Sequence, residues 1–385
     1  MKKLCVLGIT GSIGVNVADI VKNNREDFEI VGVALYSNIE ILFTVLSEHP
    51  SIKYVYVGEA KLKNEILNKY PNLTIFTKED SMIKLIDAFD YDMVVNALVG
   101  FAGLEPTVHT LRKGIDCALA NKESLVVGGE LINSILKSSS CKLYPIDSEH
   151  VALAKCLKNK KVSDVNRLIL TASGGSFRNK TRDELKNVTV DDALKHPSWK
   201  MGAKITIDSA TMINKGFEII EAYYLFNFDI DKIDVLLHDE SVIHSLIEMN
   251  DHSLLADLGP ADMRIPISYA LYEGNYHNVD DVSYLSLEDL TSLHFRKYDK
   301  NRYPGVELAK RAIREGGTMP CVLNAANEAL NLAFRQNKIS FLSIEEIIEK
   351  VMNLHTIINE PTLEDLINVN KWAYDKAISF IEKGE

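Results

Sequence analysis

The chain has 385 residues, of which 46% are hydrophobic and 25% are charged. These proportions are typical of a globular protein and exclude a largely disordered or fibrous chain. The 43 basic and 54 acidic residues give a formal net charge of −11. Because phosphate contacts need clustered lysine and arginine, we expect no nucleic-acid partner. No apolar run approaches the ~18 residues that span a bilayer, so we also expect no membrane segment.

Five cysteines are spread along the chain without a CxxC pair. This pattern is typical of reduced thiols that pack as small hydrophobic side chains, so we expect a cytoplasmic location. The length predicts two or three domains, since a domain takes ~100–200 residues.

The first 150 residues alternate between strand and helix patterns. Lys3–Ile9 is a continuous apolar run, which suits a strand buried on both faces. Residues 11–23 then place apolar side chains at helical spacing, which predicts a helix. Further strands are expected at Phe28–Leu35, Tyr54–Val57, Met93–Leu98, Asp116–Ala120 and Lys142–Ile146. This alternation predicts a parallel, doubly wound, Rossmann-like sheet.

From about residue 148 the pattern becomes mixed. Strands are expected at Arg167–Ala172, Lys204–Ile207, Leu236–Ile247 and Ser253–Leu258, and helices at about 210–225, 305–315, 321–336 and 343–354. We therefore predict an α/β protein with a nucleotide-binding domain at 1–147 and a central α/β domain at 148–273. A loop-rich linker at 274–304 would lead to a small helical domain at 305–385.

Gly8, Gly11 and Gly14 lie between the first strand and the first helix. Glycines let the chain turn sharply and let a pyrophosphate approach the backbone, where the helix N-terminus offers free N–H groups. A tight strand–helix turn without a ligand is the alternative. The strand before the glycines and the helix after them favour dinucleotide binding.

The end of the second strand indicates which dinucleotide is bound. NAD enzymes usually place an acidic residue there to hold the ribose 2′-hydroxyl, but no carboxylate follows Leu35 before Glu40. Ser37 and Asn38 could donate to a 2′-phosphate, which an acid would repel. Alternatively these two residues only form a turn, which their side chains also suit. The missing acid favours NADP over NAD.

Asp147 and Glu149 come at the end of a predicted strand. Side chains two residues apart in an extended chain point the same way, so both carboxylates could converge on one Mg²⁺ or Mn²⁺ ion. The alternative is a helix start, in which Asp147 or Ser148 caps the helix and Glu149 favours its dipole. The spacing by itself does not separate these two interpretations.

A second polar group is expected at residues 209–218. On a helix Asn214, Lys215 and Glu218 share one face, and Ser209 precedes them in a turn. These side chains suit a substrate phosphate, with lysine as the point charge and Glu218 as a further metal ligand. The simpler interpretation is an ordinary Lys215–Glu218 helix pair worth ~0.2–0.5 kcal/mol, and the residues alone favour it.

Three further polar stretches could line a site. Ser173-Gly174-Gly175 follows a strand and can present N–H groups to an anion. Asn121 and Lys122 follow the fifth strand, at the edge where doubly wound sheets bind ligands, although a polar helix start would have the same pattern. His196 and Trp199 lie in a long polar stretch, where a histidine is more often a loop residue and the tryptophan could serve as a lid.

Together these segments resemble one family, the 1-deoxy-D-xylulose 5-phosphate reductoisomerases of the methylerythritol phosphate route to isoprenoids. The similarity runs over nearly the whole chain in the same order. The matching segments are Gly8–Gly14, Ala120–Val126, Pro145–His150, Thr171–Gly175, His196–Gly202, Lys204–Glu218 and Leu323–Glu328.

The resemblance implies an NADP-dependent oxidoreductase that uses NADPH and Mg²⁺ or Mn²⁺. It would rearrange and reduce 1-deoxy-D-xylulose 5-phosphate to 2-C-methyl-D-erythritol 4-phosphate. The implied metal ligands are Asp147, Glu149 and Glu218, and these three residues with Lys122 and His196 would be catalytic. Two copies would form a homodimer through the central domain.

The resemblance also implies the remaining contacts. The substrate would contact Lys122, Ser148, Glu149, Ser173, His196, Trp199, Ser209, Asn214, Lys215 and Glu218. NADPH would contact Thr10, Gly11, Ser12, Ile13, Ser37, Asn38, Asn121, Glu123, Met201 and Gly202. Residues 196–204 would form a mobile flap that carries Trp199 and Met201.

Two rival classes are considered beside this one. A plain NADP-dependent dehydrogenase with a second α/β domain would need no three-carboxylate metal site. A non-catalytic NADP-binding regulator would need the glycine loop but neither the metal nor the phosphate group. Replacement of Glu218 separates these classes, because only the metal-dependent enzyme should lose NADPH-linked activity.

Overall fold

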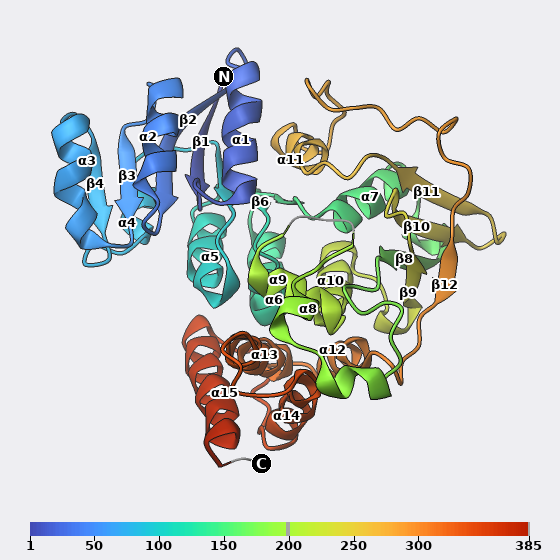
Figure 1. The fold of residues 1–385 in the computed structure, drawn as a ribbon. Coiled ribbons are helices and arrows are strands. Elements are labelled where there is room, and N and C mark those ends of the chain that lie inside the picture. Colours follow the sequence, from blue (N-terminus) through green and yellow to red (C-terminus); the bar gives the residue numbers. More distant parts are fainter. Residues whose placement is uncertain (198–200, 384–385) are drawn as a thin grey trace. The chain divides into compact units, whose positions relative to one another are not determined.

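A computed structural model describes residues 1–197 and 201–383 of the chain (Figure 1). Its contacts divide the chain into two compact units. The first unit comprises residues 1–124, 132–151 and 262–283, and the second comprises residues 125–131, 152–261 and 284–385. The chain therefore passes between the units several times. The domain boundaries at 147, 273 and 304 stay a prediction.

The first unit is built on a parallel sheet with strand order β4-β3-β2-β1-β5-β6-β7. The strands are β1 (Lys2–Leu7), β2 (Phe28–Leu35), β3 (Tyr54–Val57), β4 (Thr74–Thr77), β5 (Met93–Asn96), β6 (Asp116–Leu119) and β7 (Leu143–Pro145). The helices are α1 (Ser12–Asn23), α2 (Ile39–Glu48), α3 (Lys63–Lys69), α4 (Ile83–Asp87), α5 (Leu104–Arg112) and α11 (Arg264–Leu271). Helices α6 (Lys122–Ser138) and α7 (Ser148–Leu157) are shared by both units. This sheet confirms the predicted doubly wound fold.

The core of the first unit includes a helix from late in the chain. Ile267 and Leu271 of α11 are fully buried in the same apolar cluster as Phe28 of β2. The ring of Tyr272 packs edge to face on Phe28, with ring centroids 4.8 Å apart. Figure 1 shows α11 beside α1, with which it is in contact. Residues 262–283 therefore complete the core of the first unit.

The second unit holds a mixed sheet with strand order β11-β10-β8-β9-β12. Its strands are β8 (Val165–Ala172), β9 (Ile233–His238), β10 (Ile243–Met249), β11 (Leu254–Leu258) and β12 (Phe295–Lys297). Only β8 and β9 pair in parallel among these strands. The single strand predicted at Leu236–Ile247 is instead two strands, because the chain turns through Ser241 at a φ of 57°.

The helices of the second unit confirm the predicted helical C-terminal region. They are α8 (Val190–Ala193), α9 (Ala203–Ala210), α10 (Ile213–Phe226), α12 (Pro304–Glu315), α13 (Met319–Arg335), α14 (Phe341–Asn353) and α15 (Leu363–Lys383). The strand predicted at Lys204–Ile207 is wrong, because these residues lie within α9. Their β-branched side chains resemble a strand, but Lys204 reaches Asp208 one helical turn later. No described helix has both the length and the apolar character needed to cross a membrane.

Candidate active site

The glycine turn of the first unit has no room for side chains. Gly8 has a φ of +86°, and a Cβ on Gly14 would lie 2.3 Å from the carbonyl oxygen of Gly8. Helix α1 begins directly after Gly11, so no side chain at the N-cap position bonds the backbone N–H groups of the first turn. Gly11 and Ser12 are exposed, whereas Gly14 is buried beneath them. The turn is therefore a backbone cradle of the kind that accepts a pyrophosphate.

The residues after β2 adopt the expected turn. Tyr36 and Asn38 are exposed and Ser37 is half-buried. The Asn38 side chain caps α2, because its Oδ1 accepts a hydrogen bond from the backbone N–H of Ile41 at 3.2 Å. The Oδ1 of Asn38 is thus used within the loop, whereas the hydroxyl of Ser37 is the better candidate for a contact with a cofactor.

Asn121 and Glu123 are buried at the start of α6. The amide nitrogen of Asn121 donates to the carbonyls of Leu98 and Gly100, each at 2.9 Å. Its Oδ1 accepts from the backbone N–H of Ser124 at 3.0 Å. The side chain of Asn121 therefore caps α6 and fixes the loop after β5, as the helix-start interpretation anticipates.

Lys122 and Asp147 form a buried ion pair in the first unit. The Nζ of Lys122 lies 2.7 Å from Oδ2 of Asp147, and the two side chains are 9% and 16% exposed. Burial by itself would raise the pKa of Asp147, but the charge of Lys122 and the nearby His150 outweigh burial and hold that pKa below its usual range. Asp147 is thus kept as a carboxylate at neutral pH. The sequence analysis gave no role to His150. Its i+3 spacing from Asp147 could have indicated that the two side chains lie close together on a helix.

Glu149 lies in the first turn of α7 and not on an extended strand. The backbone N–H of Val151 donates to the carbonyl of Asp147 at 3.0 Å, so helical bonding begins there. The extended-chain argument for Asp147 and Glu149 is therefore wrong. Even so, one carboxylate oxygen of Asp147 lies within 4.8 Å of one carboxylate oxygen of Glu149. The hydroxyl of Ser148 donates to Oε2 of Glu149 at 2.5 Å.

In the second unit, α10 carries a buried carboxylate with two donors. Asn214 donates to Oε1 of Glu218 at 2.5 Å, and Lys215 is bonded to Oε2 of the same carboxylate. The side chains of Lys215 and Glu218 are only 5% and 2% exposed. Lys215 and Glu218 do form the i,i+3 helix pair that the simpler interpretation expects, but the pair is buried and not a solvated surface pair. Burial of two charges is costly, which indicates a specific requirement for them.

The Ser173 turn lies against the end of α9. Gly174 and Gly175 both have positive φ, and a Cβ on Gly175 would lie 2.5 Å from the carbonyl oxygen of Ser209. The Oγ of Ser173 is 3.1 Å from Nε2 of His196. Burial, with a smaller effect of the Arg178 charge, lowers the pKa of His196, so the ring is neutral at pH 7. The structure thus brings Ser173, His196 and Ser209 together.

The remaining candidates lie at the start of α9 and at the glycine cradle. Gly202 is the N-cap of α9 and is exposed, and Met201 before it is half-buried. Trp199 lies outside the described residues, so its predicted role as a lid stays a prediction. Thr10 and Ile13 are half-buried beside the glycine cradle. The sequence analysis gave no role to Asp208, Asn327 and Asn331, which form a buried polar cluster in the second unit.

The fold and these polar groups define the class of protein. A parallel sheet with a glycine cradle at the start of α1 is a dinucleotide-binding fold. Buried carboxylate–lysine pairs are typical of an enzyme site. The class is therefore a dinucleotide-dependent α/β enzyme with a second unit that holds a buried carboxylate–lysine pair.

Comparison with known proteins identifies the family. Residues 4–129 match the family model for 1-deoxy-D-xylulose 5-phosphate reductoisomerase. Residues 143–226 and 258–376 match models for two C-terminal domains of the same family. The chain belongs to the 1-deoxy-D-xylulose 5-phosphate reductoisomerase family.

Relatives and solved structures support this assignment over nearly the full length. The chain is 46% identical over 377 residues to the reductoisomerase of Thermoanaerobacter pseudethanolicus, with 98% of each chain covered. It is 43% identical over 371 residues to that of Geobacillus sp.. It is similar to the Zymomonas mobilis enzyme in complex with NADPH, with a TM-score of 0.92, 35% identity and 99% of each chain covered. A reductoisomerase complex with NADPH, fosmidomycin and magnesium gives a TM-score of 0.92 at 33% identity, with 99% of this chain and 98% of that one covered.

Proposed function

We propose that this chain converts 1-deoxy-D-xylulose 5-phosphate to 2-C-methyl-D-erythritol 4-phosphate with NADPH and Mg²⁺ or Mn²⁺, a step in isoprenoid precursor synthesis. The observation that carries the proposal is the buried group of Asn214, Lys215 and Glu218. It lies in a segment matched by the family model. A buried cation beside a buried carboxylate provides what a phosphorylated, metal-bound substrate requires.

The carboxylates fit a hard divalent cation. Asp147, Glu149 and Glu218 offer only oxygen donors, which Mg²⁺ and Mn²⁺ prefer. Lys122 keeps Asp147 ionised, and Lys215 compensates the charge of Glu218. We propose that these three carboxylates hold the metal. When bound, the cation polarises adjacent oxygens of the substrate and stabilises the charge that develops during the rearrangement.

The phosphate of the substrate is proposed to bind in the second unit. Lys215 supplies the point charge, and Asn214 supplies an amide donor. The hydroxyls of Ser173 and Ser209 supply further hydrogen bonds, and the neutral ring of His196 orients the Ser173 hydroxyl. Binding energy from the phosphate, far from the reacting carbons, aligns the sugar for reaction. The sugar itself would contact Lys122 and Ser148, and Trp199 would cover its carbon chain.

The glycine cradle fits NADPH, because the exposed Gly11 and Ser12 at the start of α1 leave its backbone N–H groups open to a pyrophosphate. We propose that the cofactor contacts Thr10, Gly11, Ser12, Ile13, Ser37, Asn38, Asn121, Glu123, Met201 and Gly202. When bound, NADPH supplies the hydride that reduces the rearranged aldehyde. The protein's own contribution is to hold the nicotinamide and the carbonyl carbon at the correct distance and to exclude water.

An activity assay that varies the metal and one of the carboxylates tests the proposal. Purified protein is mixed with NADPH, Mn²⁺ and 1-deoxy-D-xylulose 5-phosphate, and loss of NADPH absorbance is followed. Glu218→Gln should lose most turnover while its NADPH affinity is unchanged. Glu345→Gln, at another buried glutamate of the second unit, is the matched control and should retain turnover. Full activity after exhaustive chelation, or in Glu218→Gln, would contradict the proposed metal site.

We also infer that the enzyme is a homodimer formed through β11. This strand is at the edge of its sheet, and Leu254 and Leu258 are 56% and 40% exposed on it. An exposed edge strand rich in leucine favours pairing with a second copy. Leu254→Asp should shift the protein from dimer to monomer in sedimentation, whereas Leu287→Asp, at an equally exposed loop leucine, should not. A monomeric unmodified protein would contradict this inference.

The cysteines support a cytoplasmic location. All five are free, and four of them are buried, as expected in a reducing compartment. Cell fractionation with an antibody to the chain tests this proposal, and recovery outside the cytoplasm would contradict it.

A further inference from the structure

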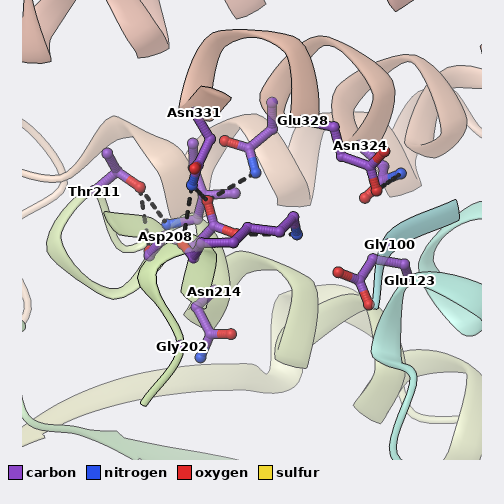
Figure 2. Close-up of polar contacts among 12 residues, drawn as sticks. Gly100, Glu123, Gly202, Asp208, Thr211, Asn214, Asn324, Glu328 and Asn331 are labelled. Atoms are coloured by element: carbon purple, nitrogen blue, oxygen red, sulfur yellow. Dashed lines mark hydrogen bonds and ion pairs between the residues drawn. The ribbon is translucent and has the colours of Figure 1, made fainter. Parts of the chain in front are cut away.

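Asp208 of α9 is a buried carboxylate with three donors. It is 3% exposed. Its Oδ1 accepts hydrogen bonds from the amide nitrogens of Asn327 at 2.9 Å and Asn331 at 2.7 Å. Its Oδ2 is 3.2 Å from the ammonium of Lys204, one turn earlier on α9. Figure 2 shows the Asp208 carboxylate facing the side chain of Asn331. This cluster is separate from the carboxylates assigned to the metal.

The two asparagines tie both ends of α9 to α13. Besides its bond to Asp208, Asn331 donates to the backbone carbonyl of Lys204 at 2.9 Å. Its own Oδ1 accepts from Arg335 at 2.8 Å, which fixes the amide orientation. If either amide were reversed, its oxygen would face a carboxylate oxygen. The hydrogen bonds that Asn327 and Asn331 donate therefore hold α9 in one position against α13.

The position of α9 in turn determines where the phosphate-binding residues lie. Ser209 directly follows Asp208, and the Thr211 hydroxyl donates to the carbonyl of Asp208 at 3.1 Å (Figure 2). Met212 then turns the chain with a φ of 62° and donates to the carbonyl of Ser209 at 3.1 Å. Helix α10, with Asn214 in its first turn, starts from this joint. A shift of α9 would therefore move Ser209 and Asn214 together.

We propose that Asn327 and Asn331 are positioning residues for the phosphate site and act through Asp208. This inference rests on the proposed function and assigns a role to a helix of the C-terminal region. A buried carboxylate that loses a donor is left with an unsatisfied acceptor, which costs free energy. The least costly response is movement of α9. Phosphate contacts tolerate displacements of only about 0.5 Å, so binding should weaken before the fold is lost.

The first test replaces Asn331 with a side chain of similar size that cannot donate. Asn331→Leu should raise KM for 1-deoxy-D-xylulose 5-phosphate, and its Kd by calorimetry, about tenfold, as expected for loss of one charge-assisted hydrogen bond. The Kd for NADPH should rise less than the Kd for the substrate, because only Met201 and Gly202 among the proposed cofactor contacts adjoin α9, whereas the glycine cradle belongs to the first unit. Thr318→Val is the matched control. Thr318 is fully buried and bonds His355 at 2.7 Å just before α13.

Thr318→Val should lower the melting temperature and leave substrate binding unchanged. Equal losses of substrate affinity in both variants would overturn the inference, as would a Kd in Asn331→Leu equal to that of the unmodified protein. Turnover by the unmodified protein tests the proposed function separately, so the two failures are distinguishable.

A second test uses an exchange of side chains and remains informative if Asn331→Leu does not fold. Asn327→Asp places two carboxylates face to face. Asp208→Asn places an amide N–H against either the ammonium of Lys204 or the amides of Asn327 and Asn331. Each should weaken substrate binding about tenfold. The double variant Asp208→Asn/Asn327→Asp restores one donor and one acceptor with the same total charge. It should bind the substrate more tightly than the two single losses combined predict, although Asn331, which donates to the same oxygen of Asp208, keeps the recovery partial. A double variant as weak as the two losses combined would refute a positioning role.

Discussion

Replacement of Gly14 by alanine tests whether the glycine cradle binds NADPH through its shape. The new Cβ would lie 2.3 Å from the carbonyl oxygen of Gly8 and 2.5 Å from Cα of Ile9. Real contacts of this kind essentially never fall below 3.0 Å, so the backbone must move by several tenths of an ångström. The backbone of Gly8 itself runs close to that of Ala97, since a Cβ added to Gly8 would lie 2.5 Å from the carbonyl oxygen of Ala97, which limits its movement in that direction. The displacement must therefore distort the turn itself.

The expected effects on stability and on binding differ in size. Overpacking costs ~1–3 kcal/mol, whereas alanine in a helix is ~1 kcal/mol better than glycine. The net loss in the free energy of unfolding of Gly14→Ala should thus be at most ~2 kcal/mol, and the variant should fold. The backbone donors of the turn would no longer converge on one pyrophosphate. We expect the Kd for NADPH to rise at least about tenfold, or ~1.4 kcal/mol.

NADPH fluorescence titration measures this Kd directly, with Gly259→Ala as the control. A Cβ on Gly259 would meet its nearest atom at 3.7 Å, which is an ordinary contact, so that variant should bind NADPH as the unmodified protein does. If Gly14→Ala bound NADPH with unchanged affinity, the turn could not be the pyrophosphate site.

Three further changes probe other parts of the molecule. Ser37→Asp should raise the Kd for NADPH about tenfold by repelling the 2′-phosphate, with a smaller effect on NADH; an equal effect on both cofactors in titration would contradict this. Burial outweighs the Arg182 charge and raises the pKa of Glu345 from 4.5 to about 7. Its contribution to stability is therefore full below pH 4.5 and is lost as the pH rises through 7. Glu345→Gln should flatten the fall in the free energy of unfolding between pH 4.5 and 7, and an unchanged pH dependence in denaturant titrations would refute this. Trp199→Ala should raise KM and lower kcat with an unchanged melting temperature, whereas a structural plug would cost ~3–5 kcal/mol on removal.

The fold of the first unit could be predicted from local patterns, because each buried strand is a continuous apolar run. Lys3–Ile9 and Phe28–Leu35 correspond closely to β1 and β2. Strand β4 escaped prediction because it is short and begins and ends with the polar residues Thr74 and Thr77, so it forms no apolar run. Lys204–Ile207 was assigned as a strand because local propensity does not include the hydrogen bonds that α13 makes with α9.

The candidate site shows a similar limit. The residue types at Asn214, Lys215 and Glu218 could be identified from spacing, but their burial could not. Burial depends on α12, where the side chain of Ala309 and the carbonyl of Gly305 leave no space for a Cβ on Gly216. These contacts join residues about 90 positions apart, which no local pattern reports. The family resemblance supplied the assignment of these residues to a phosphate and metal site, whereas their spacing alone favoured an ordinary helix pair.

The late position of α11 in the chain has a consequence for synthesis on the ribosome. Phe28 of β2 leaves the ribosome roughly 240 residues before its partners Ile267 and Leu271 are translated. At ~5–20 residues per second, this face of the nascent first unit stays uncovered for roughly 10–50 s. During that interval about half of the second unit is made, including strands β8 to β11, while this apolar surface is still incomplete. Translation speed between β2 and α11 should therefore influence the yield of native enzyme, and chaperone demand should be greatest before residue 267 emerges.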